Sequence, residues 1–251
     1  MAGRTFAFGD VHGDLDALRT VMSRLPPLHA EDGLVFVGDY LDRGPQSAQL
    51  VEYLRHELPA SVPARVVALM GNHEDAWLRV RNRGWPQFVV PVENGCLATY
   101  RSFTGGTVPA RGEFPSNDEL LEMLDGGFFP SDVAAWMEAL PAFHEDEHAI
   151  YVHAGLPRKG ERWTHPSEVP RRGPLMWLRD PEFVRSYRGK LVVFGHTPTP
   201  LLPQELSHYT AHDPTDMFGG QFVLGLDTRC GHEGGFLTAV ELPGLDVFES
   251  R

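Results

Sequence analysis

The chain has 251 residues, of which 42% are hydrophobic and 22% are charged, and its formal net charge is −12. This composition is ordinary for a globular protein, and the length is sufficient to bury a substantial core. The acidic balance argues against a nucleic-acid partner bound through a general basic surface, because neutralising phosphates requires clustered lysine and arginine.

Cysteine content and hydropathy point to a cytoplasmic protein. Cys96 and Cys230 are the only cysteines, too few for a disulfide framework or a thiolate zinc site, so we expect two reduced thiols. No apolar run is long enough to span a membrane, and the first residues lack the apolar core of a signal peptide. We therefore expect no membrane partner.

The first part of the chain alternates apolar runs with helical patterns. We expect buried strands at residues 6–8, 34–37 and 65–70. Between them the spacing predicts a helix capped by Asp14 and a second helix that starts at Pro45. This rhythm indicates parallel α/β units.

Residues 84–130 form a segment that we name the cap segment. Its many glycines and prolines predict a loop-rich excursion with one short helix near 117–124, serving as a lid or rim. Helices are expected after Glu74 and from Ser131, taken as an N-cap. Later strands are expected at 150–152 and 191–194, followed by an irregular stretch at 198–220 and a closing antiparallel region at 222–226, 236–242 and 246–249. No change of composition marks a linker, so we expect one domain over 1–251.

Five polar islands occur where the apolar runs end. They are 9–13 (Gly-Asp-Val-His-Gly), 38–44 (Gly-Asp-Tyr-Leu-Asp-Arg-Gly), 71–74 (Gly-Asn-His-Glu), 153–155 (His-Ala-Gly) and 195–197 (Gly-His-Thr). In open α/β sheets, the loops after the carboxyl ends of the strands meet in a crevice. We therefore expect the polar side chains of these islands to converge on one site.

The islands contain the ligands that two divalent metals need. Asp10 and His12 are two residues apart and can point to the same side of an extended segment, which suits one metal. The carboxylate of Asp39 could bridge both metals. The expected ligands of the second metal are Asn72, His153 and His196. Mixed oxygen and nitrogen ligands without thiolates favour Mn²⁺, with Fe or Zn²⁺ as alternatives.

The same islands offer groups for phosphoryl transfer. The guanidinium fork of Arg43 matches two phosphate oxygens. His73 is too close to Asn72 to share its metal, and we expect it to be the general acid, with Asp42 orienting its ring. The resulting hypothesis is direct hydrolysis of a phosphomonoester by a hydroxide that bridges two metals about 3.5–4 Å apart.

Taken in order, the islands resemble the phosphoprotein phosphatase branch of the calcineurin-like metallophosphoesterases, over residues 9 to 197. The chain is most similar to small bacterial members, namely Ser/Thr protein phosphatases of the phage-lambda type and symmetrical diadenosine tetraphosphatases. The resemblance implies a four-layer α/β/β/α sandwich of two mixed sheets and the ligand set named above. It also implies a second phosphate-binding arginine. Arg179 is our candidate, and the other arginines nearby are Arg171, Arg172 and Arg185.

Some positions depart from the pattern of that family. Cys96 stands where many members have glycine, after an Asn94-Gly95 pair that resembles a degenerate Asn-Gly-Gly. Arg229 follows Asp227-Thr228 where bacterial members often have glycine, and its longer side chain could enter the site and alter substrate choice. The loops that carry His212 and His232 could also approach the site.

The substrate is predicted less sharply than the reaction. Our preferred function is a protein Ser/Thr phosphatase that could also act on phosphotyrosine, and the alternative is hydrolysis of dinucleoside tetraphosphates. The alternative needs room for a second nucleotide and basic side chains at the rim, and Arg101 and Arg111 in the cap segment could serve either substrate. Two weaker hypotheses are a phosphatase acting on nucleic-acid ends and a non-catalytic, metal-binding interaction module.

Overall fold

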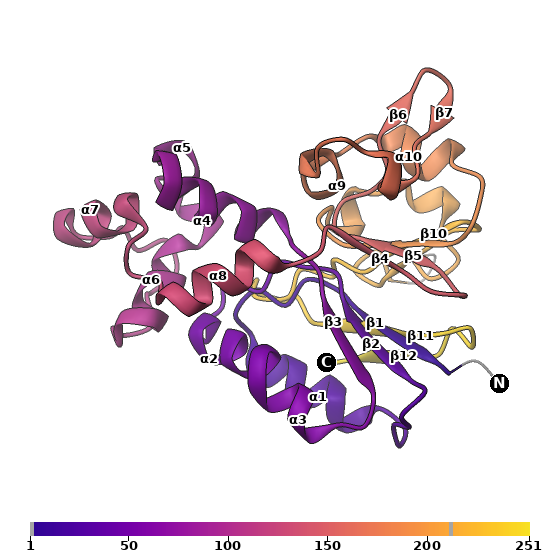
Figure 1. Cartoon of the computed structure of the whole chain (residues 1–251), viewed down its shortest axis with the longest axis horizontal. Helices are drawn as coiled ribbons and strands as arrows, with labels where there is room; N and C mark the ends of the chain where they lie inside the picture. Colours follow the sequence, from indigo (N-terminus) through magenta and orange to yellow (C-terminus); the bar gives the residue numbers. More distant parts are fainter. Residues whose placement is uncertain (1–2, 211–212) are drawn as a thin grey trace.

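The computed structural model of the chain describes residues 3–210 and 213–251. Two five-stranded sheets lie face to face, and helices cover the outer face of each (Figure 1). Within the described residues, none of the helices combines the length and apolar character needed to traverse a bilayer.

The first sheet contains the strands expected near the N-terminus. β1 (Thr5–Phe8), β2 (Gly33–Phe36) and β3 (Arg65–Ala68) pair in parallel. β11 (Thr238–Leu242) lies antiparallel on the other side of β1, and β12 (Val247–Glu249) pairs with β11. The order is therefore β12-β11-β1-β2-β3.

The second sheet is also mixed. β5 (Ile150–Val152), β8 (Val192–Phe194) and β10 (Val223–Gly225) run parallel to one another. β4 (Phe143–Glu145) and β9 (Phe218–Gly219) close the two edges in antiparallel pairs. The expected closing antiparallel region is thus wrong in part. The strand expected at 222–226 joins the second sheet beside β8, whereas the last two strands join the first.

Side-chain alternation along the strands explains the layers. Phe6 and Phe8 point to the helical side of the first sheet, whereas Ala7 points to the second sheet. There Ala7 belongs to a buried layer with Tyr151 and Val193. Because both faces of the central strands are buried, the strands read as continuous apolar runs. The predicted four-layer sandwich of two mixed sheets is confirmed.

Helices α1 (Leu15–Arg24), α2 (Ser47–Glu52) and α3 (Leu58–Ser61) cover the first sheet (Figure 1). The Asp14 side chain accepts a hydrogen bond of 2.9 Å from the N–H of Ala17, which confirms the predicted cap. The second helical stretch begins at Ser47 rather than at Pro45, and a π-helical turn (Tyr53–Glu57) joins α2 to α3.

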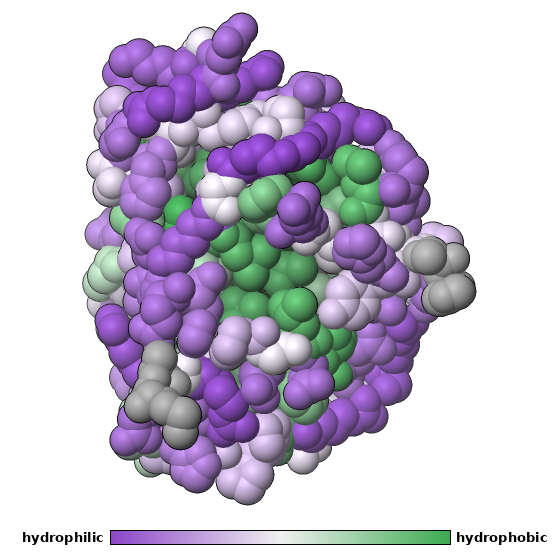
Figure 2. Space-filling model, turned by 90° about the vertical axis from the view of Figure 1, so that its right-hand side faces the viewer, coloured by the Kyte–Doolittle hydropathy of each residue, from purple (hydrophilic) through white to green (hydrophobic). Residues whose placement is uncertain are grey.

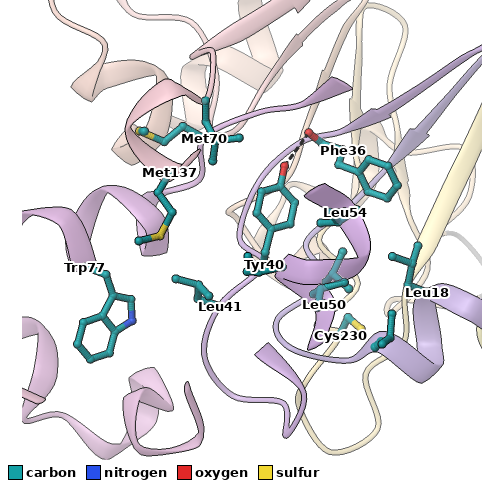
Figure 3. Close-up of a cluster of buried hydrophobic side chains, with 14 of the residues drawn as sticks. Leu18, Phe36, Tyr40, Leu41, Leu50, Leu54, Met70, Trp77, Met137 and Cys230 are labelled. Atoms are coloured by element: carbon teal, nitrogen blue, oxygen red, sulfur yellow. Dashed lines mark hydrogen bonds between the residues drawn. The ribbon is translucent and has the colours of Figure 1, made fainter. Parts of the chain in front are cut away.

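The core beneath the islands is built from these helices and the β2 end. Leu18, Leu50 and Leu54 lie around Tyr40 and Phe36, and the Tyr40 hydroxyl donates to the Phe36 carbonyl oxygen at 3.3 Å (Figure 3). The Tyr40 hydroxyl also lies 2.7 Å from the carbonyl oxygen of Leu69. This buried tyrosine anchors the loop that carries Asp39.

The cap segment is more helical than predicted. It contains α5 (Pro86–Val89), α6 (Cys96–Thr104) and α7 (Asn117–Asp125), together with a 3₁₀ turn (Val92–Asn94). The loop-rich prediction was wrong because several of its glycines are helix caps, not loop residues. Left-handed residues at both ends of α6 and at the end of α7 are Gly95 (φ 76°), Gly105 (φ 76°) and Gly126 (φ 64°).

The boundaries of two neighbouring helices also differ from prediction. α4 (Asn72–Arg83) begins at Asn72 rather than after Glu74, so it carries island residues in its first turn. α8 (Ser131–Ala139) begins at Ser131, and Pro130 rather than Ser131 occupies the N-cap position.

Short elements that the sequence did not reveal cover the second sheet. They are the hairpin β6 (Arg158–Lys159) and β7 (Arg162–Trp163), helices α9 (Gly173–Trp177) and α10 (Pro181–Ser186), and 3₁₀ turns at Pro166–Glu168, Thr199–Leu201 and Gln204–Leu206. On the side of the molecule where the N-terminus lies, a strip of apolar residues runs between polar flanks (Figure 2). The carboxyl ends of the strands, and with them the islands, lie toward the opposite end.

Candidate metal centre and phosphate site

The five islands meet at the carboxyl ends of strands from both sheets. Asp10 and His12 follow β1, Asp39 follows β2, and Asn72 follows β3. The second sheet contributes the residues that follow β5 and β8, which are His153 and His196. All six side chains are buried, with at most 6% of their surface exposed. The structure therefore brings together every predicted metal ligand.

Asp39 stands between two groups of donor atoms, one with His12 and His73 and the other with His153 and His196. Its Oδ2 lies 3.5 Å from His12 Nε2, and its Oδ1 lies 3.3 Å from His153 Nε2. Burial alone would raise the pKa of Asp39, but the surrounding imidazoles hold it well below its usual value. An ionised carboxylate shared by both groups is what the predicted bridging ligand requires.

Backbone carbonyls fix the rings of two histidines. His12 Nδ1 donates to the carbonyl oxygen of Leu41 at 2.8 Å, and His153 Nδ1 donates to that of Val37 at 2.9 Å. In both rings, Nε2 is left to face the Asp39 carboxylate. This is the orientation that places a histidine lone pair toward a metal.

The donor atoms of the second group converge on Asn72. Its Oδ1 lies 2.9 Å from His153 Nε2 and 2.7 Å from His196 Nδ1. Burial lowers the pKa of His153, but the Asp39 carboxylate outweighs it and raises that pKa to about 9. The oxygen and nitrogen donors gathered here fit divalent metals such as Mn²⁺.

Asp10 is held by the second sheet and faces a carboxylate that the sequence did not single out. Its Oδ2 accepts from the backbone N–H of His196 at 2.9 Å. Burial, followed by the charge of Asp227, raises the pKa of Asp10 well above its usual value. Asp227 is itself buried, and its pKa is raised in turn. Asp227 lies just after β10, at the end of another strand, and this position is the sequence signal that could have identified it.

The island loops adopt strained backbone conformations. Left-handed φ angles occur at the non-glycine residues His12 (46°), Asp39 (56°), Asp42 (72°), Arg43 (69°) and His196 (63°). Such residues cost about 1–3 kcal/mol each and persist only where their surroundings hold them. Their concentration here marks a functional site rather than ordinary turns.

Glu74 provides much of that support for the Asp39 loop. Its fully buried carboxylate accepts backbone N–H bonds from Asp39 at 3.0 Å, Tyr40 at 2.9 Å and Gly71 at 3.0 Å. Burial and the charge of Asp39 raise the pKa of Glu74 to about 7. The sequence identified Glu74 only as a motif residue, because a glutamate in a first helical turn usually acts as a cap.

His73 and Asp42 form the pair that the sequence predicts. His73 Nδ1 lies 2.6 Å from Asp42 Oδ2, and the indole N–H of Trp77 donates to Asp42 Oδ1 at 2.9 Å. The Asp42 N–H also donates to Thr99 Oγ1 at 2.6 Å. His73 Nε2 is left to face the centre, 3.8 Å from Asp39 Oδ2. The polar contact of Trp77 with Asp42 had no sequence signal.

The six predicted metal ligands, together with His73 and Asp42, are named the metal-ligand cluster. Arg43 lies between this cluster and the cap segment. Its guanidinium contacts His12 Nε2, and Nη2 lies 3.4 Å from His73 Nε2. The Arg43 N–H donates to the carbonyl oxygen of Gly95 at 3.3 Å. A Cβ at residue 95 would lie only 2.3 Å from the Arg43 nitrogen, so a glycine is required for this approach. The Asn94-Gly95 pair therefore shapes the Arg43 backbone.

Arg179 lies on the other side of the centre. Its Nε donates to His196 Nε2 at 3.1 Å, and its Nη2 donates to the His196 carbonyl oxygen at 3.2 Å. Trp177 ties this segment to α4 through a 2.8 Å hydrogen bond to Asp75. By contrast, the alternative candidate Arg185 forms an exposed ion pair with Glu205 at 2.8 Å.

A cavity of about 760 Å³ opens beside Arg43, between the cap segment and residues 229–233, which we name the Arg229 loop. Its polar lining includes the basic residues Arg111, Arg229 and His232 and the carboxylates of Glu93, Glu113 and Glu233. Its apolar lining comes from the cap segment and includes Val89, Val90, Pro91, Val92, Leu97, Ala98, Phe114 and Met123. Arg111 forms an ion pair with Glu233, which joins the two sides of the mouth.

Three further predictions concern Arg101, the two cysteines and His212. Arg101 is engaged by Glu113 at 2.7 Å and Glu119 at 2.8 Å, so it braces the cap segment. Cys96 and Cys230 are buried free thiols, as expected. His212 lies outside the described residues.

Buried carboxylate, amide and imidazole donors at the strand ends of two packed mixed sheets fit the class of metal-dependent phosphoesterases. The chain matches the calcineurin-like phosphoesterase family over residues 3–200 and belongs to that family. The predicted resemblance is confirmed at this level.

Curated relatives are named symmetrical bis(5'-nucleosyl)-tetraphosphatases. The protein of Methylococcus capsulatus is 27% identical over 170 residues, which cover 68% of this chain and 48% of the relative. The protein of Pseudomonas fluorescens is 28% identical over 162 residues, covering 64% and 44% of the two chains. The chain spans about half the length of the curated relatives it matches.

Solved structures support the fold. A putative diadenosine tetraphosphatase aligns with a TM-score of 0.56 at 21% identity, covering 99% of this chain and 93% of the other. A cold-active protein-tyrosine phosphatase of a Shewanella species aligns with a TM-score of 0.57 at 15% identity, covering 100% and 81%. At these identities the similarity concerns the fold alone.

Proposed function

We propose that the chain is a dinuclear metal-dependent phosphoesterase that hydrolyses dinucleoside polyphosphates. The observation that carries this substrate class is the cavity beside Arg43, whose volume of about 760 Å³ lies within the range of small-molecule sites. It combines basic side chains with an apolar wall, as a nucleotide requires. The names of the curated relatives favour the same substrate over a phosphoprotein, the substrate that we preferred from the sequence alone.

In this proposal the six buried residues would hold two divalent cations. Asp10, His12 and Asp39 would hold one, and Asp39, Asn72, His153 and His196 would hold the other. When bound, such a pair supplies a nucleophile from water at neutral pH and neutralises charge on the phosphoryl oxygens. Mn²⁺ is favoured by the donor set, with Fe or Zn²⁺ as alternatives.

In this proposal, the other residues of the site bind the phosphoryl group and protonate the leaving oxygen. Arg43 and Arg179 flank the centre from opposite sides and would bind the equatorial oxygens of the scissile phosphoryl group. For this, the Arg179 guanidinium must turn away from His196. As a water oxygen bonds to phosphorus, the bond to the leaving oxygen breaks, and His73 is placed to protonate that oxygen while Asp42 holds its ring. The cap segment would form the rim that admits the leaving nucleotide.

A substrate comparison tests the proposal. The purified chain in Mn²⁺ is given diadenosine tetraphosphate or phosphoserine, phosphothreonine and phosphotyrosine peptides, with products separated by chromatography. We expect the highest kcat/KM with the dinucleotide, and complete loss of turnover in chelator. Faster hydrolysis of a phosphopeptide would restore the protein phosphatase hypothesis, and no turnover of any phosphoester would reject both.

A further inference from the structure

We propose that Arg229 forms a second phosphate-binding subsite beside Arg43, which binds a phosphate of the leaving nucleotide rather than the phosphate under attack. This inference rests on the proposed function and names the part of the chain that would make it selective for polyphosphates. Arg229 and Arg43 line the same cavity.

The Arg229 loop is pressed directly against the metal-ligand cluster. A Cβ added at Gly231 would lie 2.8 Å from the Cβ of His12 and 3.2 Å from the Cβ of Arg43. Gly231 also has a left-handed φ of 79°. Only glycine permits this approach, so the loop is a fixed wall of the site and Arg229 is carried to its edge.

The backbone at Arg229 is strained without an evident structural benefit. Its φ is 65°, a left-handed value at which glycine is the ordinary residue. The Arg229 N–H donates to Asp227 Oδ1 at 3.0 Å, a bond that glycine could make equally well. The arginine side chain is therefore not needed for the loop conformation. Strain retained at the edge of a site indicates a use for the side chain.

That side chain is available to a ligand. Arg229 is exposed, and within the described part of the chain its guanidinium has no hydrogen bond or ion pair. The other arginine at the mouth, Arg111, is already paired with Glu233. In a chain with a net charge of −12, an unpaired arginine that lines a cavity is a specific arrangement rather than a general basic surface.

Besides Arg43 and Arg229, the charged side chains that line the cavity are Arg111 and the carboxylates Glu93, Glu113 and Glu233, of which Glu233 pairs with Arg111 and Glu113 with Arg101. His232, which also lines the cavity, has its pKa lowered to about 4 by burial and then by the charges of Arg43 and Arg229. The ligand class that matches two guanidinium groups across one cavity is a chain of phosphates, each able to accept paired N–H bonds. A phosphomonoester would reach Arg43 alone, whereas a polyphosphate would reach both.

The test variant is Arg229→Gly, which removes the guanidinium and fits the backbone. We expect KM for diadenosine tetraphosphate to rise roughly 10- to 100-fold, the loss expected for a hydrogen bond to a charged group. The ratio of kcat/KM for the dinucleotide to that for p-nitrophenyl phosphate should fall by a similar factor. Leu245→Gly is the matched control, because Leu245 also has a φ of 65° but lies in the β11–β12 turn. It should leave the ratio unchanged.

A binding measurement separates this inference from the proposed function. Inorganic tripolyphosphate and orthophosphate are titrated calorimetrically into the wild type, Arg229→Gly and Leu245→Gly proteins in saturating Mn²⁺, so chelation is equal for all three. Tripolyphosphate should bind Arg229→Gly at least about tenfold more weakly, with orthophosphate much less affected. If the wild type fails to cleave the dinucleotide, the function is rejected while this titration still decides the subsite. Equal tripolyphosphate affinity in wild type and Arg229→Gly overturns the subsite, whatever the activity.

Discussion

The metal-ligand cluster and the cavity wall beside it are held in place by different kinds of interaction. The cluster is buried, and Glu74 and backbone carbonyls hold its strained loops. The wall consists of short helices, exposed apolar residues such as Phe114, and ion pairs such as Arg111–Glu233. We infer from this difference that the cluster determines the proposed reaction, whereas the wall selects the proposed substrate and can change without loss of the chemistry.

The largest expected effect comes from Asp39→Asn, which removes the carboxylate shared by both donor groups. We expect loss of both metals and of all phosphoesterase turnover. Metal content, measured by elemental analysis after dialysis, checks this. Asp118→Asn, an exposed change in α7, is the control and should retain the metals. An Asp39→Asn protein that kept two equivalents of metal would contradict the bridging role.

His73→Ala tests the catalytic part of the cluster without removing a proposed ligand. Turnover of a phosphoserine peptide should fall about 10²–10⁴-fold, the usual contribution of a general acid. Turnover of diadenosine tetraphosphate should fall less, because a nucleoside diphosphate leaves as a stabilised anion and an alkoxide does not. Metal content should stay near that of the wild type. Unchanged turnover of both substrates would remove His73 from the mechanism.

Gly95→Ala breaks the junction between the cluster and the wall. The new Cβ would lie 2.3 Å from the Arg43 nitrogen, at a residue with a φ of 76°. We expect a loss of about 1–3 kcal/mol in unfolding free energy, together with a higher KM because Arg43 is displaced. Gly105→Ala has the same φ with open space around it, so it should lose stability but not KM. Equal KM in the two variants would show that Arg43 does not depend on Gly95.

The smallest effect is expected from Asp146→Asn, far from both regions. Asp146 Oδ2 accepts from Thr5 Oγ1 at 2.7 Å and from the Tyr151 hydroxyl at 3.0 Å, and so joins the two sheets. Burial raises its pKa, but these bonds and two backbone N–H groups outweigh it and lower the pKa. Because the folded-state pKa is lowered, the stabilisation is complete above the unfolded value near 4 and is lost as pH falls through the folded value.

Denaturant unfolding at several pH values measures this. The free energy of unfolding of the wild type should exceed that of Asp146→Asn by about 1 kcal/mol at pH 7, a modest value because the carboxylate is partly exposed to solvent. The gap should close at low pH, with kcat unaffected throughout. A gap that is constant with pH would mean that the carboxylate charge is not responsible.

The sequence was sufficient to predict the cluster because its residue types and strand-end positions are both unusual. Asp10, Asp39 and His153 each follow an apolar run, and the structure brings them together. The wall was not predictable in the same way. Gly95 and Gly126 suggested loops but end or begin helices, because one glycine serves either purpose. Trp77 had no signal, since its contact with Asp42 depends on tertiary packing alone.

The place of β1 in its sheet has a consequence for how the protein folds. β1 pairs with β2 on one side and with β11 on the other, where Thr5 lies opposite Leu242. Contacts between residues so distant in sequence form late and slow the folding of a domain. During synthesis the first strand must therefore wait, with one edge unpaired, until nearly all of the described chain has been made. Asp10 and His12, which lie just after β1, belong to a segment whose strand has both of its sheet neighbours only after β11 has been made.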